Sequence, residues 1–316
     1  MTRLGQRVLN AFPPARAIAL GAVLLAIITV AALLIAWVAG PGLTLAFGMG
    51  VLGGTTAATA VTDRVLRVST GLLLVAGAVG GSLTASSPWA CAGVVLVLAL
   101  LQAPLTAKAA GIAVFAPVIA AVFGSVDVDE RPLVIGLGVA IGFVFVQLLS
   151  TAMRLPQTSA TVAKGVAWRH ATVFALLAAP AVLLTRTLEV GHGYWLVLTL
   201  AVVLQPSPQA ARAVARARLT GTVTGVVVAI AMVVVLPGPV LMLATAACIL
   251  LATAWGVCQN VGKQAHYGVL AILFLGSGGN LAKGVDLGIE RLVLTAAAVA
   301  LAVAAAAVLT RFEQKN

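Results

Sequence analysis

The sequence predicts an all-α polytopic membrane protein with about twelve transmembrane helices, arranged as two parallel repeats of six helices. The first observation behind this prediction is composition: of the 316 residues, 62% are hydrophobic and 9% are charged. Soluble domains are about 45–50% apolar and about 25% charged, so this chain has more apolar surface than a soluble core needs. The other two observations are an internal repeat and the placement of positive charge between apolar segments.

The second half of the chain repeats features of the first half after about 150 to 160 residues. The paired positions are Arg67 and Arg218, Pro88 and Pro239, Lys108 and Lys263, and Glu130 and Glu290. Small insertions in two turns account for the drift in spacing. Duplicated membrane folds usually place their working site between the two copies, so we expect a pathway there.

Crossing a bilayer takes about 20 mostly apolar residues. In the first half, the segments expected to cross are 17–39, 43–62, 68–85, 89–106, 109–125 and 132–153. Their boundaries are marked by Gly40-Pro41-Gly42, Arg67, Pro88, Lys108 and Glu130-Arg131. In the second half they are 170–186, 193–206, 219–236, 239–256, 264–279 and 287–310, with the corresponding markers Gly191-His192-Gly193, Arg218, Pro239, Lys263 and Glu290-Arg291. The fifth, eighth and eleventh segments are the weakest of the twelve.

Positive charge sets the orientation, because cytoplasmic loops carry an excess of Lys and Arg. With the N-terminus inside, 15 of the 19 Lys and Arg residues fall on the cytoplasmic side and six of the eight acids fall outside. We therefore expect a multi-pass protein of the inner (plasma) membrane with both termini cytoplasmic. The predicted parts are a cytoplasmic segment 1–15, a first repeat 16–153, a cytoplasmic linker 154–168, a second repeat 169–311 and a cytoplasmic tail 312–316.

Several classes of function lack support in the sequence. The net charge of +11 comes from cations between apolar segments, which argues against nucleic-acid binding. Gly262-Lys263-Gln264 lacks the spacing and the Ser or Thr of an ATP-binding loop. His170, His192 and His266 are too scattered for a metal site. We expect no enzyme activity and no cofactor. The lipid bilayer is an expected partner, and a homo-oligomer or a soluble partner protein is left open.

One segment of the second half resembles a known family. Tyr194-Trp195 begins a helix, Thr199 follows four residues after Trp195, Gln205-Pro206 breaks the helix, and Arg218 precedes Gly221-Thr222-Val223-Thr224-Gly225. This pattern is similar to the fusaric-acid-resistance-like (FUSC) family of the aromatic acid exporter superfamily. That family's closing helices are similar to the segments that contain His266-Tyr267 and Glu290-Arg291-Leu292. The resemblance is looser in the first half, which has Leu43-Thr44 where Tyr-Trp would fall.

The resemblance implies efflux or conduction of organic anions, especially aromatic carboxylates. Larger members carry a soluble cytoplasmic domain that has no counterpart in this sequence. Related plant malate channels use one six-helix unit per subunit as a dimer, so the resemblance implies a covalent pseudo-dimer. Two alternatives to an exporter stay open. The protein could be a channel-like anion conductance, or a non-transporting component that binds lipid or a partner.

The predicted pathway residues are polar side chains within or beside apolar helices: Lys108, Lys263, Gln264, His266, Tyr267, Thr55, Thr59 and Trp195. Polar residues at membrane depth usually face the bundle interior or water. For each of them a second interpretation stays open. Lys108 and Lys263, which each open a helix, also fit topology markers, the threonines also fit bonds to their own helix, and Trp195 also fits an interfacial anchor.

Arg212, Arg216 and Arg218 precede the ninth segment and predict a basic cytoplasmic mouth that gathers anions. Anionic lipid headgroups are the alternative partner for these arginines. The four Gly-x-x-x-Gly pairs at Gly50, Gly77, Gly138 and Gly221 predict close helix packing. The pairs Glu130-Arg131 and Glu290-Arg291 are expected to be local ion pairs at the outer rim.

Overall fold

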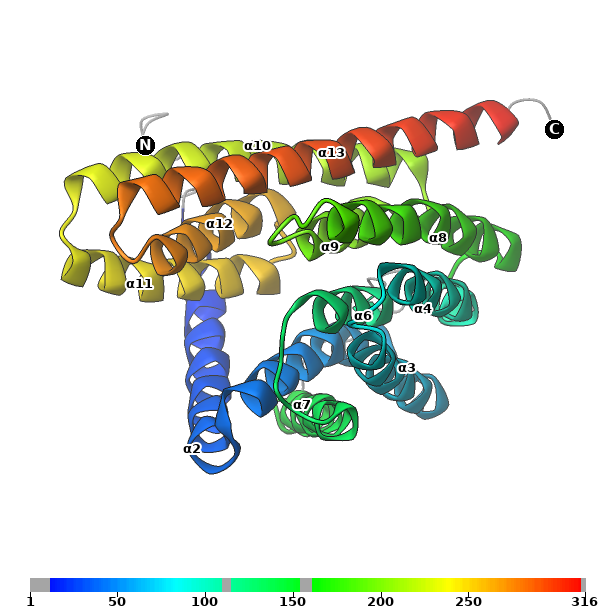
Figure 1. Ribbon diagram of the computed structural model, residues 1–316, viewed down its shortest axis with the longest axis horizontal. Helices are drawn as coiled ribbons and strands as arrows, with labels where there is room; N and C mark the ends of the chain where they lie inside the picture. The colour runs from blue at the N-terminus through cyan, green and yellow to red at the C-terminus, as the bar shows by residue number, and fades with distance from the viewer. Residues whose placement is uncertain (1–11, 110–114, 154–160, 314–316) are drawn as a thin grey trace. The chain divides into compact units, whose positions relative to one another are not determined.

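The computed structural model describes residues 12–109, 115–153 and 161–313 (Figure 1). Within these ranges every regular element is a helix and no strand occurs, which confirms the all-α class. The helices are α2 (Ala15–Ala60), α3 (Arg64–Leu83), α4 (Pro88–Leu101), α5 (Ala103–Lys108), α6 (Phe115–Ser125), α7 (Pro132–Ala152), α8 (Lys164–Thr187), α9 (Tyr194–Val203), α10 (Pro208–Val235), α11 (Gly238–Val257), α12 (Val261–Ser277) and α13 (Leu281–Glu313).

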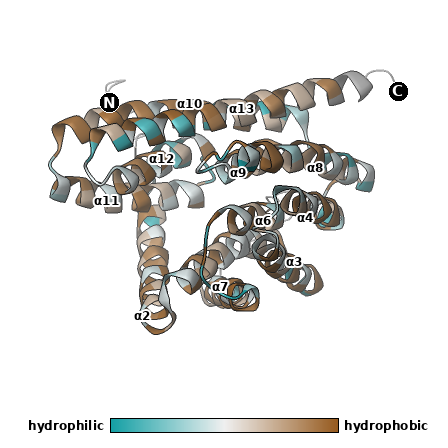
Figure 2. Cartoon of the chain, in the orientation of Figure 1, coloured by the Kyte–Doolittle hydropathy of each residue, from teal (hydrophilic) through white to brown (hydrophobic). Residues whose placement is uncertain are grey.

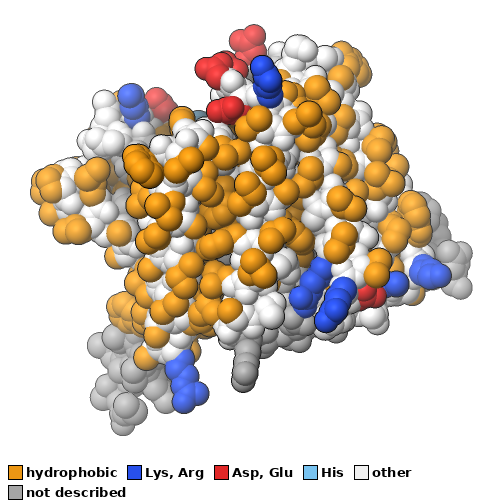
Figure 3. All heavy atoms as spheres, turned by 90° about the horizontal axis from the view of Figure 1, so that it is seen from below, with side chains coloured by type: hydrophobic (Ala, Val, Ile, Leu, Met, Phe, Trp, Pro, Cys, Tyr) orange, Lys and Arg blue, Asp and Glu red, His pale blue; other side chains and the backbone are white. Residues whose placement is uncertain are grey.

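In the described ranges, eight helical stretches are long and apolar enough to cross a membrane. Hydrophobic residues predominate along the helices in Figure 2. Large apolar side chains are exposed where a soluble protein would bury them, among them Trp37 at 85%, Leu133 at 78% and Met242 at 77%. On the face seen in Figure 3, hydrophobic side chains cover most of the surface and charged ones gather near its edges. A multi-pass membrane protein is therefore confirmed.

The count of twelve crossings stays a prediction. Two of the predicted segments share one long helix, and three others form helices that are short for a crossing. The first two lie in α2, which bends at Gly40, where φ is +84° and Pro41 follows. Proline cannot donate a backbone hydrogen bond, so the helical ladder is interrupted there. The fifth, eighth and eleventh segments correspond to α6, α9 and α12, which have 11, 10 and 17 residues.

Glycine pairs bring helices together, as predicted. A Cβ atom at Gly50 of α2 would collide with the carbonyl oxygen of Val139 in α7, and one at Gly142 of α7 would collide with that of Phe47 in α2. Between α3 and α6, Gly77 and Gly81 make the same kind of close approach to Ala116 and Ala120. Both helices of this second pair therefore run in the same direction.

The described chain divides into two compact units. Unit 1 comprises the described part of Met1–Ala31 with Arg212–Val299, and unit 2 comprises Ala32–Ala211 with the described part of Ala300–Asn316. These boundaries differ from those of the predicted repeats, because α8 packs against α4 and α5, and α9 packs against α6. The predicted repeats stay a prediction.

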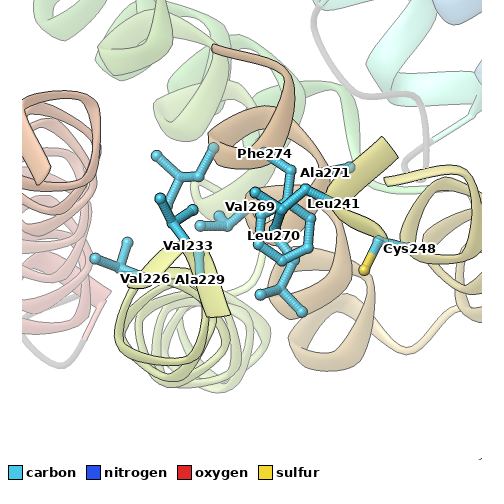
Figure 4. Packing of buried hydrophobic residues seen from close by; sticks show 10 residues of the cluster. Val226, Ala229, Val233, Leu241, Cys248, Val269, Leu270, Ala271 and Phe274 are labelled. Atoms are coloured by element: carbon cyan, nitrogen blue, oxygen red, sulfur yellow. The ribbon is translucent and has the colours of Figure 1, made fainter. Parts of the chain in front are cut away.

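The core of unit 1 lies among α10, α11 and α12 (Figure 4). Val226, Ala229 and Val233 follow one face of α10, and Val269, Leu270 and Phe274 of α12 pack with them. Leu287 and Leu292 bring α13 onto the same cluster. This packing holds α10, α12 and α13 against one another, and the candidate site is built from polar residues of these helices.

Candidate functional site

Lys263 lies in the first turn of α12 and contacts the end of α11. Its Nζ atom is 3.8 Å from the centroid of the Trp255 ring, a distance at which a cation is attracted to the ring face. The side chain of Asn260 caps the helix by accepting a hydrogen bond of 3.1 Å from the backbone N–H of Lys263. The predicted position of Lys263 at a helix start is therefore confirmed, and the side chain is half-buried.

His266 joins α12 to α10. Its Nδ1 atom lies 3.0 Å from the hydroxyl oxygen of Thr224, and its ring meets the ring of Tyr267 edge-on with centroids 5.0 Å apart. Gly225 makes this approach possible, since a Cβ atom there would lie 2.8 Å from the carbonyl oxygen of His266. Gln264, by contrast, is exposed. The structure thus brings Lys263, His266 and Tyr267 together along one helix of unit 1.

The three arginines of the predicted basic mouth have different environments. Arg212 and Arg216 are one helical turn apart and exposed. Arg218 is half-buried, and its Nε atom is buried without a hydrogen-bond partner among the described residues. Arg218 therefore lies on a different face of α10 from Arg212 and Arg216. This follows from the 3.6 residues per turn of a helix, because Arg218 comes only two residues after Arg216.

Lys108 belongs to unit 2, and its predicted place at the start of a helix is wrong. It is the last residue of α5 and is exposed. Pro104 falls in the first turn of α5 and starts this short helix before the lysine. A cation at a helix C-terminus is stabilised by the helix dipole, so Lys108 does not carry the unfavourable interaction that a lysine at a helix start has.

Thr55 and Thr59 make hydrogen bonds to their own helix. The hydroxyl of Thr55 donates to the carbonyl oxygen of Val51 at 2.7 Å, and that of Thr59 donates to the carbonyl oxygen of Thr55 at 3.0 Å. These are the local bonds that threonine makes in apolar helices. Whether the two side chains also line a pathway stays a prediction.

Trp195 is buried in unit 2, with 7% of its surface exposed. Its ring stacks on that of His192, with centroids 4.4 Å apart and an interplanar angle of 15°. Thr199, one turn later, is fully buried and its hydroxyl has no hydrogen-bond partner among the described residues. The Trp-x-x-x-Thr pattern thus forms a buried face of α9.

Three buried polar residues of α10 and α13 were not among the predicted pathway residues. Arg291, expected at the outer rim, is only 2% exposed, and Thr222 and Thr295 are 0% exposed. Gly288 of α13 marks the contact with α10, since a Cβ atom there would lie 3.0 Å from Cγ1 of Val226. A signal was present in the sequence, because Arg291 and Thr295 lie one turn apart within the apolar stretch Leu281–Val308.

A small pocket in unit 2 lies where α8 meets the segment after α9. Its lining includes Arg169, His170, Gln205 and Pro206. The Nε2 atom of His170 lies 2.9 Å from the carbonyl oxygen of Leu204, and this contact fixes the imidazole ring at the pocket wall. In the described ranges, no group of His, Cys, Asp or Glu side chains could hold a metal ion.

A family model described as fusaric acid resistance protein-like matches residues 177–305. The match covers less than half of the chain, and it shows what this segment is similar to. The comparison confirms the resemblance that Trp195, Arg218 and the glycines after it indicate. No curated protein and no solved structure matches the chain.

The fusaric acid resistance protein-like segment includes part of α8, all of α9 to α12 and most of α13. Lys263, His266, Arg291 and the buried threonines of α10 and α13 therefore all lie inside it. Lys108, Thr55 and Thr59 lie outside. The family is one of membrane transporters, which fits a chain with several apolar helices.

Proposed function

We propose that the protein is a membrane transporter that exports small organic anions of the aromatic carboxylate type. The observation that carries the proposal is the coincidence of the family match with a cationic set of side chains inside apolar helices. Lys263 and Arg218 are half-buried and Arg291 is buried, whereas no Asp or Glu is buried among the described residues. Cationic side chains within apolar helices raise the local potential and favour an anionic substrate.

We further propose that the membrane part consists of two parallel six-helix repeats with twelve crossings. Corresponding helix pairs support this arrangement. In the first half α3 and α6 run parallel, and in the second half α10 and α12 also run parallel, because Gly221 meets Gly262 and Gly225 meets His266. These pairs are the third and fifth predicted segments of each repeat.

The short helix α9 provides a second argument for twelve crossings. Before α9, a Cβ atom at Gly193 would collide with Thr185 near the end of α8. After α9, the carbonyl oxygen of Leu204 contacts His170 near the start of α8. The segment from Gly193 to Leu204 therefore runs back along most of α8, as a crossing segment would.

For orientation we propose an inner-membrane protein with cytoplasmic termini. Arg212 and Arg216, which are exposed at the start of α10, would then face the cytoplasm and concentrate anionic substrate there. Lys263 and His266 would lie further along the same pathway. A pathway between the two repeats remains part of this proposal, with Lys263 at the start of α12 beside it.

The direct test is flux of benzoate in proteoliposomes that contain the purified full chain. We expect uptake above that of empty liposomes, and we expect Lys263→Gln to lower it because the substitution removes a cation from the pathway. Lys283→Gln is the matched control, since Lys283 is exposed in the first turn of α13. Equal flux from wild type and from empty liposomes contradicts the proposed function.

A channel-like conductance is the second candidate. The absence of a buried Asp or Glu among the described residues removes the usual carboxylate relay of a proton-coupled pump and favours passive movement. A membrane potential imposed on the same liposomes separates the two, because a passive conductance carries benzoate with the potential and needs no pH gradient. A protein that moves no anion but co-purifies with a stoichiometric partner would instead be a non-transporting component.

A further inference from the structure

We propose that the small pocket between α8 and the segment after α9 receives the carboxyl group of the transported anion, and that the anion binds there together with a proton at Nδ1 of His170. The class of ligand rests on the proposed function. The binding position rests on the pocket and on the hydrogen bonding of His170. Every residue that lines this pocket belongs to unit 2.

The pocket has a buried floor and a more exposed mouth. His170 and Leu204, with 5% and 3% of their surface exposed, form the floor, whereas Gln205 is half-buried and Arg169 is exposed. The volume of about 20 Å³ has room for one water-sized group, such as an oxygen of a carboxyl group. The remaining lining residues are apolar: Val166, Val173, Pro206 and Pro208. The pocket therefore suits the polar head of a ligand whose body is apolar.

The hydrogen bond of His170 determines which ring nitrogen carries its proton. Nε2 lies 2.9 Å from the carbonyl oxygen of Leu204, and Nε2 must donate because a carbonyl oxygen only accepts. In a neutral imidazole the other nitrogen, Nδ1, is then an acceptor. Nδ1 is buried and has no hydrogen-bond partner among the described residues, although buried polar atoms nearly always have one. A ligand that arrives with a proton would complete this nitrogen.

Gln205 and Pro206 place the carbonyl oxygen of Leu204 within reach of His170. Pro206 has no N–H, so the carbonyl oxygen of Val202, four residues earlier, lacks its usual helical donor. The side-chain Nε2 of Gln205 donates to that oxygen instead, at 2.7 Å. Leu204 has extended backbone angles just after α9, and its carbonyl oxygen is thus outside the helical ladder. The break after α9 therefore shapes the pocket and holds the imidazole ring.

Among the described residues, the helices around His170 carry no carboxylate. The helices α4, α5, α6 and α9 pack against α8, and none of the five contains Asp or Glu. The charged or titratable residues of the four neighbours are Cys91, Lys108 and Tyr194. Those of α8 besides His170 are Lys164, Arg169 and Arg186, and on α10 Arg212 follows Pro208 by one turn. The charges are all positive, so they oppose a proton on His170 alone and favour an anion.

Binding of the anion is therefore linked to binding of a proton. A carboxylate has no proton to offer to Nδ1, so its binding to neutral His170 takes up one from solution. The proton then lies between Nδ1 and a carboxyl oxygen, in a charge-assisted hydrogen bond. Because the complex holds one more proton than the free protein and free benzoate, Kd should rise about tenfold for each unit of pH above the range in which free His170 is protonated.

The test is calorimetric titration of benzoate into the purified full chain at pH 7 and at pH 8, in buffers that differ in their enthalpy of ionisation. We expect uptake of about one proton per benzoate and a Kd about tenfold higher at pH 8. His170→Gln keeps an N–H near the position of Nε2 and removes the titratable nitrogen. It should abolish the proton uptake and weaken binding at pH 7 by about tenfold or more, with an unchanged unfolding temperature.

His192→Gln is the matched control, since His192 precedes α9 and is not part of the pocket lining, and it should keep the proton uptake. A wild-type Kd that is equal at the two pH values, without proton uptake, overturns the proposal and leaves the pocket to a water molecule. Full proton uptake in His170→Gln also overturns it, because the proton then binds elsewhere.

Flux of benzoate in proteoliposomes separates this site from the proposed function. Wild-type protein that binds benzoate with proton uptake but moves none contradicts the transport function and leaves the site intact. Wild-type protein that moves benzoate but binds it without proton uptake contradicts the site alone.

Discussion

The Nδ1 atom of His266 lies 3.0 Å from the hydroxyl oxygen of Thr224, and this polar contact joins α12 to α10. It lies beside the closest approach of the two helices, where Gly221 meets Gly262. A hydrogen bond between helices in an apolar surrounding fixes their register, whereas glycine contacts fix their separation. The candidate region of unit 1 is therefore held by two kinds of contact that can be removed independently.

The first prediction concerns this hydrogen bond. Thr224→Val keeps the packing volume and removes the hydroxyl, so the free energy of unfolding should fall by about 0.5–1.5 kcal/mol. Thermal unfolding of the purified protein measures the change. Thr253→Val is the control, since the hydroxyl of Thr253 bonds only its own helix at Ile249. An equal effect in both variants would contradict a role for His266 in joining the helices.

The second prediction concerns helix separation. A Cβ atom at Gly221 would collide with the carbonyl oxygen of Gly262, so Gly221→Ala forces α10 and α12 apart. Overpacking of this kind costs about 1–3 kcal/mol. Gly268→Ala in α12 meets no atom within 4 Å and should be neutral or slightly stabilising. Differential scanning calorimetry of both variants makes the comparison, and a stable Gly221→Ala protein would contradict the contact.

The third prediction concerns orientation and uses the native cysteines. Cys258 is exposed, whereas Cys91 and Cys248 are buried. The proposed orientation places Cys258 in the cytoplasmic turn between α11 and α12. A membrane-impermeant maleimide should label the protein in inside-out vesicles and not in intact cells, and Cys258→Ser should abolish the labelling. Labelling in intact cells would reverse the orientation.

The fourth prediction concerns the cation–π contact. Trp255→Phe keeps a ring beneath Lys263, whereas Trp255→Leu removes it. If Lys263 contributes to the pathway from this position, benzoate flux should fall in the leucine variant and be largely retained in the phenylalanine variant. Proteoliposome uptake measures both. Equal flux in the two variants would show that the aromatic ring has no part in positioning Lys263.

Much of the fold followed from local patterns. Hydropathy located the helices, and the break at Gly40 and Pro41 was predictable because both residues interrupt a helix. The glycine pairs predicted close packing, which the approach of Gly50 to Val139 confirms. Partner choice was not predictable, because α8 packs against α4 and α5 through apolar surfaces that any other helix could also have offered.

The candidate site was only partly predictable for a related reason. Lys263 and His266 follow a helix start that Asn260 marks, so their positions follow from sequence. Arg291 was expected at a rim because it adjoins Glu290 and lies near the start of α13. Its burial depends on which face α13 turns toward α10, and that face is set by the contact of Gly288 with Val226. The apolar stretch around Arg291 indicated burial, but the partner helix depends on this contact between distant segments, which the local sequence does not give.

Uptake of radiolabelled benzoate into proteoliposomes tests the central claim most directly. Wild-type protein should take up benzoate well above empty liposomes, and Lys263→Gln should lower the rate while Lys283→Gln keeps it. Wild-type uptake equal to that of empty liposomes, with correctly folded and inserted protein, would contradict the account.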